Sequence, residues 1–275
     1  MKTLILSGFG TNCEKETRHA CLQAGAEAVE VRHINEIYQS ALNLESYGFL
    51  ILGGGFMDGD DLGSGRACAN RFRYRDLPGG GTFLDRLHEF IDQGRLVLGI
   101  CNGFQVLVKL GLLPGALSPG KKESRVTLTN NAHGRFENRW VHLHADPNSP
   151  CVFTKGLGPL ELPVRHGEGR LIGEDDALTD RLVEQGLAPL RYALADGSPT
   201  EEYPANPNGS PHGIAALCNT QGTVLGLMPH PEAYNHYTNH PRWTRQVAEH
   251  GAPTDETGDG LALFRNAYAY LKARG

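Results

Sequence analysis

One cysteine in this sequence has the neighbours that a nucleophile requires. Cys101 follows the apolar segment 95–100, and Gly99 and Gly103 lie two residues to either side of it. This spacing has the form of the nucleophile elbow, G-x-S-x-G, with cysteine in place of serine. In such a strand-to-helix turn the neighbouring backbones come so close that a Cβ at either glycine would clash. The pattern therefore favours a nucleophilic thiol over a buried structural cysteine.

Backbone donors for a reaction intermediate can be expected on both sides of this thiol. The helix that begins after Cys101 presents unpaired N–H groups and a partial positive charge, which favour the thiolate. The N–H of Asn102 is placed to bind an oxyanion. The glycine run 53–55 lacks the pattern of a phosphate loop. We expect it instead to bring a second backbone N–H close to the thiol.

A thiolate that transfers acyl groups needs a base, and the base needs a partner that orients it. Of the twelve histidines, His230 in "GLMPHPEAY" is the best candidate. Pro231 biases His230 toward an extended backbone, in which residues i and i+2 project to the same side. His230 and Glu232 would then share a side, provided that the chain bends locally to join them. An ordinary surface turn is the alternative for this motif taken alone.

The remaining histidine patterns are weaker. His236 and His240 have the i,i+4 spacing of helical metal ligands, but no third ligand is suggested and Pro241 argues against a helix. We therefore expect a solvated loop there and no metal site. His166 in "VRHGEGR" lies between a strand-like segment and a glycine-rich turn. A structural histidine and a pocket residue are equally compatible with that position.

The elements that must position these residues alternate between short apolar strands and amphipathic helices. Strands are predicted at 3–8, 28–31, 48–56 and 95–100, and helices at 14–26, at 82–94 and after residue 101. Thr82 and Asp85 have the spacing of a capping box. This alternation indicates a mostly parallel sheet covered by helices on both faces. Sites in such sheets form beyond the carboxyl ends of the strands, here at loops 53–66 and 101–104.

The pattern changes after Pro119. Residues 123–145 read as extended β structure, and 146–212 are rich in proline and glycine with a helix-like stretch at 175–186. Segment 213–232 reads as two strands joined by a turn at 219–222. A last helix carries Leu261, Phe264, Tyr268 and Leu271 as its core-facing stripe. We expect one domain over 1–275, with an elaborated segment at about 120–212.

Composition excludes several classes of function. The 275 residues carry a formal net charge of −5 and no Lys/Arg block, which argues against a general nucleic-acid binder. No segment approaches the roughly 18 apolar residues of a spanning helix, and no signal-peptide core precedes Ser7. The six cysteines form no C-x-x-C pair, so we expect free thiols and a cytoplasmic location.

Taken together, "GICNGFQVLVKLGLLPGAL" and "GLMPHPE" resemble the class I, or triad-type, glutamine amidotransferases, whose fold is flavodoxin-like. Segments along nearly the whole chain resemble one branch of that class, the glutaminase components of phosphoribosylformylglycinamidine synthases. They include "GTNCEKET", "GGGFMDGDDLGSG", "NAHGRFENRWV", "VRHGEGR", "YPANPNGSPHGIAAL" and "LFRNAY". The chain departs from the family at 57–60, where a Ser-Tyr-Gly-Asp sequence is common, and in a longer segment 233–260.

The resemblance implies a role for individual residues. Cys101 would be the nucleophile, His230 the general base and acid, and Glu232 the group that orients it. The backbone N–H groups of Gly55 and Asn102 would hold the oxyanion. The substrate pocket would be formed by Gln105, Arg135 and Phe136.

The resemblance also implies an activity and a partner. The chain would hydrolyse L-glutamine and pass ammonia to a large synthetase subunit, with or without a small bridging subunit. It would carry no cofactor itself, because ATP and Mg²⁺ would bind to the synthetase, and it would contact neither nucleic acid nor membrane. Two other functions remain open: a cysteine hydrolase of the same fold, such as a γ-glutamyl peptidase, and a non-catalytic binding module.

Overall fold

A six-stranded sheet forms the centre of the computed structural model, which describes residues 2–39, 42–60, 62–115 and 125–274. The strand order is β10-β11-β4-β3-β1-β2, and every neighbouring pair is parallel except β10 and β11. The bounds are β1 (Lys2–Ser7), β2 (Ala28–His33), β3 (Tyr47–Leu52), β4 (Leu96–Ile100), β10 (Ala216–Cys218) and β11 (Val224–Leu227). Strands β3 and β4 are buried at every position, as near-continuous apolar strands of a covered sheet should be.

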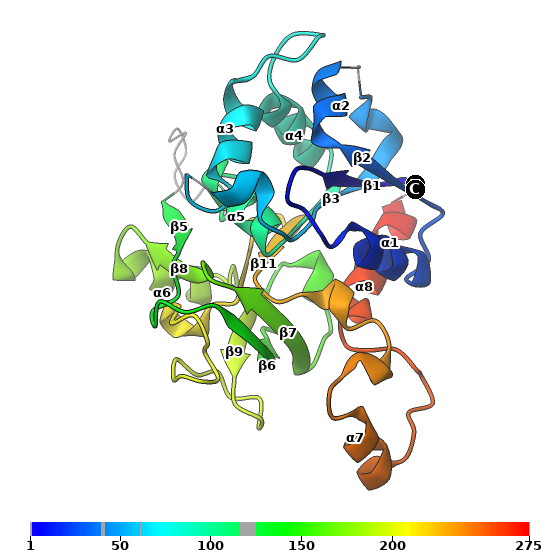
Figure 1. Cartoon of the computed structure of the whole chain (residues 1–275), viewed down its shortest axis with the longest axis vertical. Coiled ribbons are helices and arrows are strands. Elements are labelled where there is room, and N and C mark those ends of the chain that lie inside the picture. Colours follow the sequence, from blue (N-terminus) through cyan, green and yellow to red (C-terminus); the bar gives the residue numbers. More distant parts are fainter. Residues whose placement is uncertain (1, 40–41, 61, 116–124, 275) are drawn as a thin grey trace.

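Helices cover both faces of this sheet (Figure 1). One layer holds α1 (Glu14–Gln23) and the C-terminal α8 (Leu261–Arg274), where the Tyr268 hydroxyl lies 2.7 Å from Thr3 Oγ1 of β1. The other layer holds α3 (Arg66–Tyr74), α4 (Phe83–Asp92) and α5 (Asn102–Lys109), and α2 (Ile34–Gln39) follows β2. The capping box predicted for α4 is confirmed, because the side chains of Thr82 and Asp85 each accept from the other's backbone N–H.

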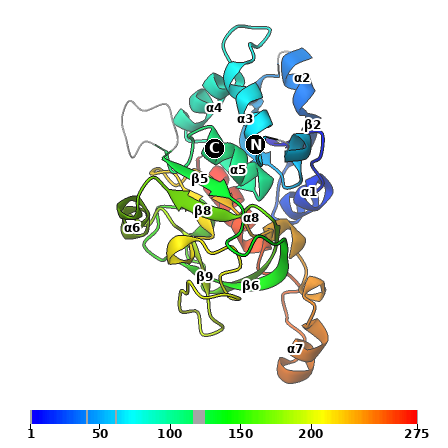
Figure 2. The same cartoon turned by 60° about the vertical axis from the view of Figure 1, so that its left-hand side comes forward.

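A second, β-rich region lies against the central sheet (Figure 2). It contains the pair β5 (Val126–Thr129) and β8 (Arg170–Gly173), and the sheet of β7 (Leu160–His166), β6 (Glu137–Ala145) and β9 (Leu190–Ala193). Helix α6 (Asp176–Glu184) follows β8. The His230 N–H donates to Pro163 O at 2.8 Å, which joins β7 to the segment that follows β11. The two sheets therefore meet beyond the carboxyl end of β11.

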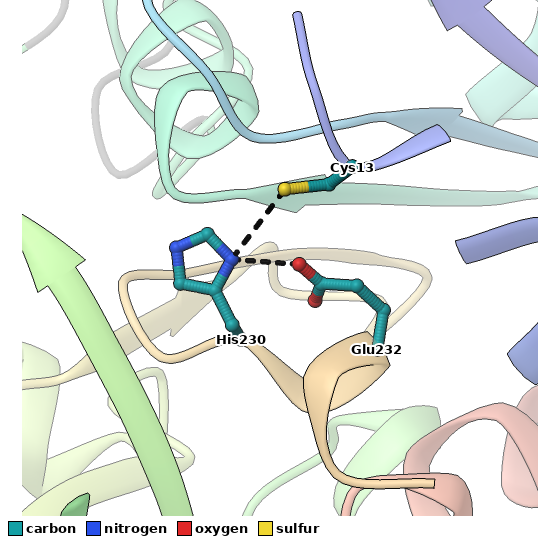
Figure 3. A group of neighbouring side chains, drawn as sticks. All are labelled: Cys13, His230 and Glu232. Carbon is teal, nitrogen blue, oxygen red and sulfur yellow. Dashed lines mark hydrogen bonds and ion pairs between the residues drawn. The ribbon is translucent and has the colours of Figure 1, made fainter. Parts of the chain in front are cut away.

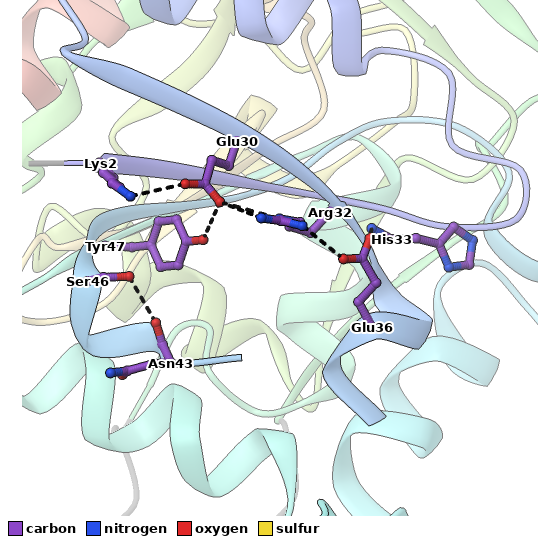
Figure 4. A network of polar contacts seen from close by, with 8 residues as sticks. All are labelled: Lys2, Glu30, Arg32, His33, Glu36, Asn43, Ser46 and Tyr47. Atoms are coloured by element: carbon purple, nitrogen blue, oxygen red, sulfur yellow. Dashed lines mark hydrogen bonds and ion pairs between the residues drawn. The ribbon is translucent and has the colours of Figure 1, made fainter. Parts of the chain in front are cut away.

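Short 3₁₀ helices complete the structure: η1 (Leu44–Ser46), η2 (Met57–Asp60), η3 (Val152–Thr154), η4 (Pro211–Gly213), η5 (Pro231–Ala233) and η6 (Tyr237–Asn239). At the amino ends of β1 and β3, Figure 4 shows Glu30 of β2 bonded to Lys2 at 3.2 Å and to Tyr47 at 2.8 Å. The hydrogen bond from Tyr47 is the main reason that the pKa of Glu30 is lowered. This network lies at the opposite end of the strands from Cys101.

The structure agrees with the predicted fold class, and most of the predicted elements are present. The antiparallel pair within 213–232 and the helix within 175–186 are confirmed. The extended structure predicted over 123–145 is present as β5 and β6, with a turn at 130–136 between them, and residues 123–124 lie outside the described residues. Helices α2, α3 and α7 (Trp243–His250) were not predicted. Helix α7 has no buried residue and stands away from the rest of the chain in both views (Figures 1 and 2).

The predicted solvated loop at His236 and His240 is only half correct. His236 is half-buried, but His240 is fully buried, and the Nε2 of His240 lies 3.2 Å from Glu161 Oε2. Its ring also packs edge-on against Trp140, with the centroids 4.5 Å apart. Apolar packing and one carboxylate therefore hold His240 in place. Over the residues described, no helix has both the length and the apolar character needed to cross a bilayer.

Candidate active site

Cys101 lies at a strained turn between β4 and α5. Its backbone has φ 50° and ψ −102°, a conformation that few non-glycine residues adopt. A Cβ placed on Gly103 would lie 2.0 Å from Leu52 O, and one on Gly99 would lie 2.7 Å from the backbone of Gly103. Neither contact is possible, so both flanking glycines are required by close approach. The structure thus gives the sequence G-I-C-N-G the geometry of a nucleophile elbow.

His230 and Glu232 form a buried pair at the carboxyl end of β11. The local bend is supplied by η5, and His230 Nδ1 lies 2.6 Å from Glu232 Oε1. Both side chains are almost wholly excluded from solvent, at 4% and 1% exposure. A carboxylate at this distance fixes the imidazole with its proton on Nδ1 and leaves Nε2 free to accept one. Within the described part of the chain, Nε2 has no hydrogen-bond partner.

The thiol of Cys101 lies close to this imidazole. A Cβ on Gly54 would meet His230 Cε1 at 2.9 Å and Cys101 Cβ at 3.5 Å, so both side chains border the same glycine. Burial lowers the pKa of His230, but the Glu232 carboxylate and then Cys101 outweigh it, so the pKa is raised well above 6.5. The thiol itself points toward Arg165 O, 3.7 Å away. The arrangement can therefore hold a thiolate beside an imidazolium.

The two predicted oxyanion donors lie on either side of the nucleophile in the chain fold: Asn102 directly follows Cys101, and Gly55, in the loop after β3, borders the same cavity as Cys101. Asn102 is the first residue of α5, so its N–H has no acceptor within the helix. Gly55 has φ 141°, and a Cβ there would lie 2.3 Å from Gly10 O, so no other residue fits. The side chain of Asn102 fastens the glycine loop to α5: its Oδ1 accepts from Met57 N at 2.9 Å, and its Nδ2 donates to Asp60 Oδ1 at 3.2 Å.

A cavity of about 300 Å³ connects the nucleophile, the base and the glycine loop. Two exposed aromatic rings, Phe56 and Phe136, flank it with their centroids 6.4 Å apart. Two groups of opposite charge, Glu16 and Arg165, also border it. The full lining is Asn12, Cys13, Glu16, Gly55, Phe56, Cys101, Phe136, Arg165, His230, Glu232 and Ala233.

Two predicted pocket residues lie outside this lining. Gln105 is buried behind the turn, where its Oε1 accepts from Asn102 Nδ2 at 2.8 Å and its Nε2 donates to Glu168 O. In this structure it supports Asn102 instead of facing the cavity. Arg135 is exposed on the turn between β5 and β6, next to Phe136, and its carbonyl accepts from Asn131 Nδ2. Phe136 is the member of this predicted group that borders the cavity.

His166 lies deep in the protein, close enough to His230 to affect its charge. Burial is the main reason, followed by repulsion from His230, that its pKa is lowered to about 3, so the ring is neutral. Its Nδ1 lies 3.0 Å from Asn131 Oδ1, and Asn131 also receives the Gly169 N–H at 3.1 Å. These contacts favour the structural interpretation of His166, as part of the network that shapes the turn after β7.

Several cavity residues are not predicted from the sequence, among them Glu16, Phe56, Arg165 and, next to the imidazole, Cys13. Cys13 precedes α1, its thiol donates to Asn12 Oδ1 at 3.1 Å, and its Sγ lies 3.9 Å from His230 Nδ1 (Figure 3). It borders the same cavity as Cys101. The segment "GTNCEKET" contributed to the family resemblance, but its spacing indicates no role for the cysteine. Only the topology, which brings the loop after β1 to the end of β4, reveals it.

The comparisons with known proteins identify the class. The family described as the CobB/CobQ-like glutamine amidotransferase domain matches residues 1–271. The chain therefore belongs to this family of glutamine amidotransferases.

Individual relatives within this family share one enzyme name. The chain is 42% identical over 272 residues to a protein of Dehalococcoides mccartyi named phosphoribosylformylglycinamidine synthase subunit PurQ, covering 99% of this chain and 98% of the relative. It is 35% identical over 242 residues to the human phosphoribosylformylglycinamidine synthase, covering 84% of this chain but 18% of that longer protein. A solved structure titled PurLQS from Thermotoga maritima matches with a TM-score of 0.67 and 27% identity, covering 98% of each chain.

Proposed function

We propose that this chain is the glutaminase subunit of a phosphoribosylformylglycinamidine synthase. The observation that carries the proposal is the strained Cys101 elbow facing a buried His230–Glu232 pair across one cavity. Full-length similarity to proteins named as that subunit supports the choice of this synthase within the family. The six cysteines are unpaired thiols, which supports a reducing, cytoplasmic location.

The first half of the reaction forms a thioester. The Cys101 thiolate attacks the side-chain carbonyl carbon of L-glutamine, and the electron pair of the C=O bond moves to oxygen. The N–H groups of Gly55 and Asn102 stabilise that oxyanion, and losing one such donor typically costs about 2.7–4 kcal/mol in acyl-transfer enzymes. Collapse of the intermediate breaks the C–N bond, and protonated His230 gives its proton to the departing nitrogen. Ammonia leaves, and a γ-glutamyl thioester remains on Cys101.

The second half releases glutamate. His230, now neutral, takes a proton from water as that water attacks the thioester carbonyl. The second tetrahedral intermediate uses the same two backbone donors and collapses with Cys101 as the leaving thiolate. The proton on Nε2 of His230 restores the starting ion pair. Glu232 keeps its hydrogen bond to Nδ1 throughout and holds the ring in the productive orientation.

Glutamine carries charges that the cavity can match. Arg165 is suited to its α-carboxylate and Glu16 to its α-ammonium, since these two side chains of opposite sign border the cavity. Phe56 and Phe136 would cover the apolar part of the substrate. Arg165 lies beside the nucleophile, because its carbonyl oxygen is 3.7 Å from the Cys101 thiol.

The ammonia must be used by another polypeptide. In this proposal, a large synthetase subunit binds ATP and Mg²⁺ and converts formylglycinamide ribonucleotide to its amidine, with or without a small bridging subunit. This chain itself would need no cofactor. The partnership is supported by the relatives, which are named as subunits, and by the solved PurLQS structure.

A reconstituted complex with Cys101→Ser tests the proposal. Glutamine-dependent amidine formation and glutamate release should both fall to background, whereas amidine formation from ammonium chloride should persist at the wild-type rate. Cys21→Ser, which removes a buried thiol that does not line the cavity, is the matched control and should keep both activities. Wild-type glutamate release by Cys101→Ser would overturn the assignment of the nucleophile.

A further inference from the structure

Three side chains of types that bind metal ions lie together beside the Nδ1 nitrogen of His230 (Figure 3). They are Cys13, from the loop before α1, and His230 and Glu232, from the end of β11 and η5. One ligand atom from each of the three residues lies within 4.8 Å of the other two. All three side chains are buried.

The separations are close to those of a tetrahedral zinc site. Zinc bonds of about 2.3 Å to sulfur and about 2.0–2.2 Å to nitrogen or oxygen place the ligand atoms about 3.6 Å (S to N) and about 3.4 Å (N to O) apart. The observed distance from Cys13 Sγ to His230 Nδ1 is 3.9 Å. Nδ1 and Glu232 Oε1 are 2.6 Å apart and would have to separate by less than an ångström.

Cys13 and Glu232 have atoms that are available as metal ligands. Glu232 Oε2 is buried and has no hydrogen-bond partner among the described residues, so this oxygen is available as a ligand. The hydrogen bond from His230 Nδ1–H to Oε1 is given up when the cation takes the Nδ1 lone pair. A buried, unpaired carboxylate oxygen is costly, and a cation would satisfy it. Cys13 gives up only its thiol hydrogen bond to Asn12. The cavity borders all three residues and provides both a route for entry and room for a water as fourth ligand.

We propose that Cys13, His230 Nδ1 and Glu232 form an inhibitory site for a thiophilic divalent cation such as Zn²⁺. Binding releases two protons to solvent, the thiol proton of Cys13 and the Nδ1 proton of the His230 imidazolium, and puts the freed Nδ1 lone pair on the cation. The ring proton must then reside on Nε2, the nitrogen that should accept a proton from Cys101 or water. With its base blocked, the enzyme loses both halves of the reaction. The inhibition, although not the binding, rests on the proposed glutaminase function.

Binding can be measured without any activity. Cd²⁺ is a suitable probe, because its thiolate complexes absorb in the ultraviolet. Titration of wild type, of Cys101→Ser and of the control Cys21→Ala should give one thiolate-bound cation per chain with similar affinity. Cys13→Ala and Cys13→Ser should bind at least about tenfold more weakly, because losing even a hydrogen-bond partner of a metal ligand typically lowers metal affinity by about 10- to 100-fold. The thiolate band should be absent in both variants. Retention of the band in a folded Cys13 variant, or its loss in Cys101→Ser, would overturn the site.

Inhibition is then tested in the reconstituted complex. Glutamate release is measured against Zn²⁺ concentration, each variant is compared with its own metal-free rate, and a chelator should restore activity. Both Cys13 variants should need at least about tenfold more Zn²⁺ than wild type or Cys21→Ala for half inhibition. Equal sensitivity would place the inhibitory ion on Cys101 and overturn the proposal. Absence of glutamine hydrolysis in metal-free wild type would instead refute the proposed function and leave the Cd²⁺ result valid.

Discussion

Substitution of Gly103 by alanine is the sharpest test of the elbow. Gly103 lies in the first turn of α5, where alanine is otherwise about 0.8–1.0 kcal/mol more favourable than glycine. In this structure its Cβ would lie 2.0 Å from Leu52 O, and Cβ contacts under 3.0 Å are essentially never observed. The helix start and β3 must therefore separate by about 1 Å (3.0 − 2.0). Because the opposing atom belongs to the backbone, no side-chain rotation can relieve the contact.

The displacement falls on the nucleophile, because Cys101 and Asn102 lie directly before Gly103. A misplacement of about 1 Å can lower a rate about 10²-fold, and overpacking costs about 1–3 kcal/mol of stability. We expect Gly103→Ala to fold, with a lower Tm, and to lose about two orders of magnitude in kcat/KM for glutamate release in the complex. The rate of Cys101 alkylation by a diazo-ketone analogue of glutamine should fall in parallel.

The matched control is Gly158→Ala, where no heavy atom lies within 4 Å of the added Cβ and φ is not in the left-handed region. It should keep wild-type activity and Tm. If Gly103→Ala matched Gly158→Ala in both rate and stability, the close approach between α5 and β3 would be wrong, and with it the geometric argument for the elbow.

Three further predictions follow from the site. Glu232→Gln, which keeps the shape but removes the charge beside His230, should lower kcat for glutamate release by about 10⁴-fold, as in related triads, and a loss of less than tenfold would contradict its orienting role. Arg165→Ala should raise the KM for glutamine about 10- to 100-fold with little change in kcat, because the substrate loses one charge-assisted hydrogen bond. An unchanged KM would mean that Arg165 does not bind the substrate. The pKa of His166 is about 3 in the folded chain, below its ordinary value of 6.5, so the unfolded chain binds the extra proton and stability falls as pH drops from 6.5 toward 3. Between pH 6.5 and pH 4, the free energy of unfolding measured with denaturant should fall by about 3 kcal/mol more in wild type than in His166→Gln. An equal fall in both proteins would mean that His166 is not a buried neutral ring.

Local chemistry made part of this site predictable from the sequence. The spacing of Gly99 and Gly103 around Cys101 was enough to predict a turn too tight for a Cβ at either position. The structure shows the backbone contacts that such a Cβ would make. The segments before Cys101 and His230 were predicted as buried apolar strands. Because β4 and β11 are parallel neighbours, the two residues that follow them lie at the same edge of the sheet. The local bend that joins His230 to Glu232 was stated as a condition, and η5 fulfils it.

Other residues depended on contacts between distant segments. Cys13 reaches His230 only because β1 lies beside β3 in the sheet order, and no local pattern distinguishes it from the other buried cysteines. Arg165 belongs to a different sheet, which is joined to the site by the bridge between Val164 and Pro229. Gln105 faces inward because a neighbouring carbonyl, Glu168 O, accepts its amide. The division of the chain into one domain with an elaborated segment stays a prediction.

The most direct test of the central claim is to find the covalent intermediate. The reconstituted complex is mixed with glutamine, quenched with acid within a turnover and digested, and the peptide that carries a γ-glutamyl group is identified by mass. The diazo-ketone analogue serves as the stable equivalent, with Cys101→Ser as control. The account predicts a single modified residue, Cys101, and none in the variant. Modification of Cys13 instead, or turnover of glutamine with Cys101 unmodified, would contradict it.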